Sequence, residues 1–167
     1  MLKDWNKVEQ PTAEEVDKRL ANAKNSLLQQ QIAMKEKKLP VIVLLEGWGA
    51  AGKGSVLGKL IKNIDPRFFK VAVMDEPTEE EKRKPFLYRH FVKIPEAGKF
   101  VFMDSGWMSE VTSQKLSGEL SEEEYKKRIE SIKRFERQLT DNGYLLLKFF
   151  FNIDKKEQKK RLKKLVE

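Results

Sequence analysis

The sequence has no cysteine and only one histidine among its 167 residues. Disulfides and thiolate chemistry are therefore excluded, and a structural zinc site is not expected. No apolar run approaches the length of a membrane span and no secretory hydrophobic segment follows Met1, so the default expectation is a cytoplasmic protein without a membrane partner. With 40% hydrophobic and 36% charged residues, the chain is expected to form a soluble globular domain.

The formal net charge of +8 is concentrated near the end of the chain. The segment 155–164 holds seven basic residues against one acid, Glu157. A basic helix of this kind can attract a polyanion, but it is more often a solvated helix face, and the solvated face is the favoured interpretation. No specific nucleic-acid partner is predicted.

Apolar strands alternate with helical patterns along the chain. A continuous apolar run at 41–45 is typical of a strand buried on both faces, and further strands are predicted at 69–74, 99–103 and 144–151. Capping boxes at Thr12 and Ser121 open two long helices, and Pro85 is expected to kink or divide a helical stretch over 79–94. This alternation predicts an α/β fold, with a parallel sheet of at least four strands and helices on both faces.

The segment after the first strand matches two phosphate-binding patterns. Gly47, Gly49 and Gly52 have the dinucleotide-fingerprint spacing, while Gly47, Gly52 and Lys53 have the P-loop spacing. Lys53 and Asp104, an acid at the end of a buried strand, favour the P-loop; Asp75 gives some support to a dinucleotide site. The predicted phosphate-binding residues are Gly47, Gly49, Ala50, Ala51, Gly52, Lys53, Gly54 and Ser55. Gly54 stands where a P-loop usually has the serine or threonine that binds Mg²⁺.

The segment 46–55, EGWGAAGKGS, closely resembles the P-loop of family-2 polyphosphate kinases, which also carry glycine after the lysine. The resemblance runs from about Lys24 to the end of the chain. Trp48 looks most like the tandem-domain members, which phosphorylate AMP from polyphosphate. Other similar segments are 65–67 (DPR), 76–80 (EPTEE), 85–89 (PFLYR), 94–98 (IPEAG), 104–107 (DSGW), 122–125 (EEEY) and 155–158 (KKEQ).

The resemblance implies a P-loop kinase-like sheet with strand order 2-3-1-4. It also implies an enzyme with a polyphosphate donor, AMP or ADP as acceptor, and Mg²⁺ as cofactor. By position, Lys53 would grip phosphate, Asp104 would hold the metal, and Arg89 would bind phosphate; a surface salt bridge is the open alternative for Arg89. We expect residues 1–167 to form a single domain that lacks its C-terminal part and belongs to an oligomer or a tandem-domain protein.

Three departures from the family pattern keep other functions open. Family loops commonly carry an acid where Gly49 stands, Ser105 replaces an arginine, and family members continue beyond Glu167. Phosphoryl transfer depends on positioned cations and metal. One alternative is therefore a non-catalytic P-loop half that binds polyphosphate or nucleotide and supports a neighbouring active domain. An ATP-dependent nucleotide kinase is the other alternative.

A few remaining residues have structural interpretations. His90 has no acidic partner that is evident in the sequence, so a helix-surface or packing role is expected. Trp48 could stack on a base or cap the core, and Trp107 is expected to pack. The strand at 144–151 is apolar on both faces and is expected to lie at a sheet edge, which another strand or a partner subunit would cover.

Overall fold

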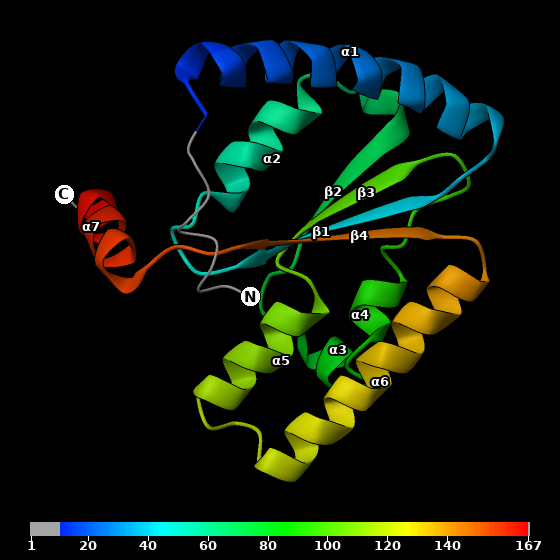
Figure 1. The fold of residues 1–167 in the computed structure, drawn as a ribbon. Coiled ribbons are helices and arrows are strands. Elements are labelled where there is room, and N and C mark those ends of the chain that lie inside the picture. Colours follow the sequence, from blue (N-terminus) through cyan, green and yellow to red (C-terminus); the bar gives the residue numbers. More distant parts are fainter. Residues whose placement is uncertain (1–10, 167) are drawn as a thin grey trace.

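A four-stranded parallel sheet lies between two layers of helices in the computed structural model, which describes residues 11–166 (Figure 1). The strand order is β2-β3-β1-β4, which confirms the predicted order 2-3-1-4. The strands are β1 (Val41–Gly47), β2 (Phe69–Val73), β3 (Phe100–Asp104) and β4 (Leu145–Phe151). The helices are α1 (Ala13–Glu36), α2 (Lys53–Ile61), α3 (Glu79–Lys82), α4 (Tyr88–Phe91), α5 (Trp107–Leu116), α6 (Glu122–Asp141) and α7 (Lys155–Val166), with a 3-10 turn η2 (Pro66–Phe68).

The two central strands are buried because helices cover both faces of the sheet. Helices α1 and α2 lie on one face, and α5 and α6 lie on the other together with α3 and α4 (Figure 1). Successive side chains of a strand point to opposite faces. Along β1, Val43 and Leu45 therefore pack with Leu57 of α2, while Ile42 and Leu44 pack on the opposite face. The continuous apolar runs of β1 and β3 match this double burial.

The predicted capping boxes are both present. Thr12 and Ser121 each accept a hydrogen bond from the backbone N–H group three residues later, and Glu15 and Glu124 bond back to the cap backbone. Each box pairs two N–H groups that would otherwise lack an acceptor at the start of a helix. The local sequence thus fixes where α1 and α6 begin.

One helical region confirms the sequence-based expectation and another differs from it. The stretch 79–94 is divided into the short helices α3 and α4, with Pro85 between them. Proline lacks a backbone N–H and disfavours a helical conformation in the preceding residue, so the helix ends rather than kinks. Helix α5 was not predicted, because it has no side-chain cap and follows β3 almost directly. Its buried residues Trp107 and Val111, spaced by four, are the signal that could have revealed it.

Strand β4 lies at one edge of the sheet and is largely exposed in the described part of the chain. Among the described strands, β4 pairs with β1 alone. Leu145, Leu147 and Phe149 lie on the α2 face and are 41%, 36% and 49% exposed, while Phe150 on the other face is 58% exposed. An apolar edge of this kind is a surface on which another strand or chain can pair. Within residues 11–166, no helix is both long enough and apolar enough to cross a membrane.

We therefore expect the 167-residue chain to self-associate through β4. The double substitution Leu147→Lys and Phe149→Lys places two charges on the exposed face and should shift the particle towards monomer mass in light scattering. The control is Gln29→Lys with Gln30→Lys, which adds the same charge to exposed positions of α1. A wild-type chain that stays monomeric at high concentration would contradict this expectation.

Candidate active site

The segment between β1 and α2 forms a tight loop at the carboxyl edge of the sheet. Gly47 has φ +134°, and a Cβ atom at this position would collide with the carbonyl oxygen of Phe151 on β4. Ala50 and Gly52 also have positive φ, at 61° and 98°. Only glycine adopts such angles readily, so Gly47 and Gly52 permit the turn, while Ala50 holds a left-handed conformation at some cost.

The loop presents backbone N–H groups that have no partner among residues 11–166. Ala51 donates its N–H to the carbonyl of Trp48 over 3.2 Å and thereby closes a turn. Unpaired N–H groups at the N-terminus of a helix, together with the helix dipole, form an anion-binding site. Within the described residues, the N–H groups without a protein acceptor belong to Gly49, Ala50, Gly52, Lys53, Gly54 and Ser55.

Lys53 is the first residue of α2, and its side chain folds back over the loop. The Nζ atom donates to the carbonyl oxygens of Gly47 and Trp48 at 3.2 and 3.3 Å. These two bonds hold the ammonium group above the loop at the edge of the sheet. The predicted phosphate-gripping lysine is therefore positioned beside the unpaired N–H groups rather than directed into solvent.

Asp104 ends β3 next to this loop. It is paired in register with Leu45 of β1, so the carboxyl ends of the two central strands meet at the same edge. The carboxylate Oδ2 lies 3.9 Å from the position that a Cβ atom of Gly54 would occupy. We call the cavity of about 580 Å³ between them the loop cavity; it is lined by Lys53, Gly54, Asp104 and Ser105, among others.

Arg89 lines a second cavity of about 710 Å³, the polar cavity, which adjoins the loop cavity at Lys53 and Ser105. It lies on α4 and is only 5% exposed. Its guanidinium donates to the carbonyl oxygen of Asp75 and lies 3.7 Å from Glu110. Arg89 is therefore buried, although Asp75 is exposed and Glu110 is half-buried, and the alternative of a surface salt bridge was wrong.

Glu110 on α5 joins Arg89 to a buried histidine. The Nε2 atom of His90 lies 3.0 Å from the Glu110 carboxylate, and the imidazole packs edge-on against Trp107. His90 is fully buried, so the packing role is confirmed among the two expected, and its acidic partner is Glu110, which was not evident in the sequence. No sequence pattern pointed to this pair, because Glu110 lies on the unpredicted helix α5.

The two tryptophans near the site have different environments. Trp107 is fully buried, as expected, and its indole N–H donates to Glu136 over 2.9 Å. Trp48 is 44% exposed, so it does not cap the core; its indole N–H donates to Asn152 over 2.9 Å. Trp48 and Phe150 line a third cavity of about 500 Å³ on the β4 side of the loop.

The arrangement suits Mg²⁺ only if substrate phosphates supply most of its ligands. Among residues 11–166, no group of three or more histidine or acidic side chains could hold a metal ion. Mg²⁺ is commonly bound by one or two carboxylates together with substrate phosphates and water. Asp104, a single carboxylate beside the unpaired N–H groups, fits that role.

A glycine-rich loop joins a buried strand to a helix, the helix carries a lysine, and an aspartate ends the neighbouring strand. These features define a P-loop phosphate-binding protein. The sequence profile of one such family, polyphosphate kinase 2, matches residues 10–167. The chain belongs to the polyphosphate kinase 2 family, whose members are polyphosphate-dependent nucleotide phosphotransferases.

Relatives with established names agree with this assignment. The chain is 30% identical to ADP-polyphosphate phosphotransferase 3 of Rhizobium meliloti over 89% of its length, and it covers 52% of that protein. It is 33% identical to polyphosphate:AMP phosphotransferase of Pseudomonas aeruginosa, again over 89% of its length, and covers 30% of that protein. The crystal structure of polyphosphate kinase 2 from Arthrobacter aurescens superposes with a TM-score of 0.85 at 27% identity, covering 94% of this chain and 58% of that one.

Replacing Lys53 by alanine should weaken the binding of tripolyphosphate by roughly tenfold to hundredfold, because a charge-assisted hydrogen bond to phosphate is lost. Calorimetry with tripolyphosphate measures this change. Lys59→Ala is the control, since it removes the same charge from an exposed position of α2. Equal affinities of the two variants would show that Lys53 acts only through its general charge.

Proposed function

We propose that this chain transfers phosphate between polyphosphate and a nucleoside mono- or diphosphate, AMP or ADP. The chain spans about half or less of the length of the two named relatives, so the activity of the whole protein belongs to this proposal. One relative is named for ADP and the other for AMP, at similar identity, which makes either nucleotide a reasonable acceptor.

The observation that carries the proposal is the meeting of two cavities at Lys53. A phosphotransferase must bring two phosphorylated substrates together at one point, with the reacting atoms in contact. The loop cavity offers unpaired N–H groups and Asp104, and the polar cavity offers Arg89. Lys53 lines both cavities, so its ammonium lies where the transferred phosphoryl group would be shared.

Each residue then has a role that follows from its position. The N–H groups of the loop would bind phosphate oxygens, and Lys53 would stabilise the charge on the transferred group. Mg²⁺ held by Asp104 would neutralise phosphate charge during the transfer. Arg89, fixed by the Asp75 carbonyl and Glu110, would bind phosphate from the opposite cavity, and its buried pairing would keep it in one orientation.

A second candidate function is a non-catalytic half that binds polyphosphate or nucleotide and supports an active domain. Two positions favour it. Gly49 supplies no carboxylate to the loop, and Ser105, which has φ +67°, supplies a short hydroxyl where the family has a guanidinium. Transition-state stabilisation by cations contributes much of the rate of phosphoryl transfer, so the loss of one cation matters.

One set of assays separates the candidates. The chain is incubated with Mg²⁺ and either polyphosphate plus AMP, polyphosphate plus ADP, or ATP plus AMP, and the nucleotide products are quantified. Turnover with polyphosphate supports the proposed function, and its acceptor preference identifies the substrate. Tripolyphosphate binding without turnover supports the non-catalytic half, whereas turnover with ATP alone supports an ATP-dependent nucleotide kinase.

Asp104→Asn should abolish turnover while leaving the fold intact, because the amide cannot replace a carboxylate as a Mg²⁺ ligand. Circular dichroism checks the fold, and the polyphosphate assay measures the activity. Asp141→Asn is the control, since that residue ends α6 on the surface, where it forms an ion pair with Arg137. Full activity of Asp104→Asn would remove Asp104 from the metal site.

A further inference from the structure

Helix α7 lies beyond the carboxyl ends of the strands, outside both helix layers, and packs against the phosphate-binding loop (Figure 1). The Nε2 atom of Gln158 donates to the carbonyl oxygen of Gly49 over 3.1 Å. The Nη1 atom of Arg161 donates to the carbonyl oxygens of Ala50 and Ala51 over 3.3 and 3.4 Å. Two side chains of α7 thus bind three successive carbonyls of the loop.

These bonds determine where the loop's N–H groups point. In a trans peptide, the carbonyl oxygen of one residue and the N–H of the next point in opposite directions. When α7 holds the carbonyls of Gly49, Ala50 and Ala51, the N–H groups of Ala50, Ala51 and Gly52 are turned away from α7. Those of Ala50 and Gly52 have no acceptor in the described part of the chain, so they are free to bind an anion.

We infer that Gln158 and Arg161 are positioning residues for the phosphate-binding loop. They hold it in the anion-binding conformation before phosphate arrives. A loop that contains glycine and a left-handed alanine has many other conformations available, and fixing it in advance removes an entropic cost from binding. The inference rests on the proposed function of the loop as a phosphate site.

The distribution of side chains on α7 supports this role. Gln158, Arg161 and Leu165 recur at helical spacing on the side that faces the loop, and Leu165 lines the loop cavity. Arg161 is itself held by Glu157, whose carboxylate accepts from Nε over 2.7 Å. Hydrogen bonding to the arginine guanidinium lowers the pKa of Glu157, which keeps this partner charged.

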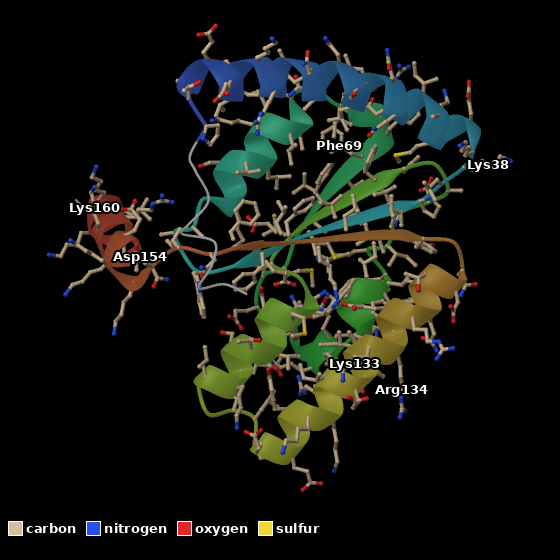
Figure 2. The ribbon with its side chains drawn as sticks, viewed as in Figure 1. Lys38, Phe69, Lys133, Arg134, Asp154 and Lys160 are labelled. Carbon is tan, nitrogen blue, oxygen red and sulfur yellow. The ribbon has the colours of Figure 1, made fainter. Side chains whose placement is uncertain are left out.

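The lysines of α7 occupy a different face. Lys155, Lys156, Lys159, Lys160, Lys163 and Lys164 are all exposed, and their spacing places them on the half of the helix opposite the loop contacts. Nitrogen-tipped side chains of α7 extend away from the sheet, and Lys160 is labelled there (Figure 2). The lysine face is exposed, and it supplies matched controls for Arg161.

The experiment compares variants that remove a loop contact with one that removes only a charge. Arg161→Met and Gln158→Met keep side-chain length and lose their donors, while Arg161→Lys keeps the charge but loses the planar fork. Lys163→Met removes one charge from the opposite face and is the control. Two properties are measured on the whole chain: calorimetric affinity for tripolyphosphate, and hydrogen exchange of the loop amides without any anion.

The expected result is a loss of affinity of about tenfold for Arg161→Met, a smaller loss for Gln158→Met, and partial recovery in Arg161→Lys. Exchange of the Ala51 amide, which donates to the Trp48 carbonyl, should become faster in Arg161→Met and Gln158→Met while the β1 and β3 amides keep their protection. Lys163→Met should match the wild type in both measurements. In turnover assays, Arg161→Met and Gln158→Met should raise KM for polyphosphate more than they lower kcat.

Two results would overturn the inference. One is wild-type affinity together with wild-type loop exchange in Arg161→Met. The other is an equal loss of affinity in Lys163→Met, which would show that general charge, and not the contact, is responsible. If the wild-type chain does not bind tripolyphosphate, the proposed function fails, and loop exchange alone then decides whether α7 holds the loop.

Discussion

The parallel pairing of β1 with β3 on one side and with β4 on the other constrains the whole site. Gly47 lies directly opposite Phe151, so closely that a side chain at this position would collide with the neighbouring backbone. The chain must therefore leave the sheet at that point as a glycine-rich loop. β3 ends at Asp104, which pairs with Leu45 near the end of β1, so the same edge also carries Asp104. The loop, the metal-binding candidate and Lys53 are together because the three strands end at the same edge of the sheet.

A chain of contacts, which runs through the buried side chains of Arg89, His90 and Trp107, connects this edge to the helices behind it. Arg89 lies beside Glu110, Glu110 bonds His90, and His90 packs on Trp107. The indole of Trp107 donates to Glu136 of α6, which also binds Lys148 of β4. Charged groups away from water are tolerated only when they are paired, so these contacts fix the relative positions of α4, α5 and α6. The orientation of Arg89 thus depends on packing far from the phosphate loop.

The departures from the family pattern change the chemistry more than the fold. Gly49 lies in the loop, Gly54 in the first turn of α2 and Ser105 just after β3, and each lacks a side-chain group that P-loops, or the family that the sequence resembles, usually carry there. The backbone at these three positions still forms the loop, the start of the helix and the end of the strand that a P-loop requires. Phosphate binding through N–H groups needs only the backbone, whereas catalysis needs the side chains. The structure therefore supports anion binding more directly than it supports a fast reaction.

The sequence by itself determined the local features. Apolar periodicity predicted all four strands, and the capping boxes at Thr12 and Ser121 placed two helix starts. The glycine spacing with Lys53 located the loop. These signals depend on nearby residues alone. Only the tertiary structure decided the contacts across long separations. Three features depend on how the elements pack. Arg89 and His90 are buried beside Glu110, β4 is exposed, and Arg161 bonds a loop that lies more than a hundred residues earlier in the chain. No local pattern encodes such partners, because they meet only after the sheet has formed.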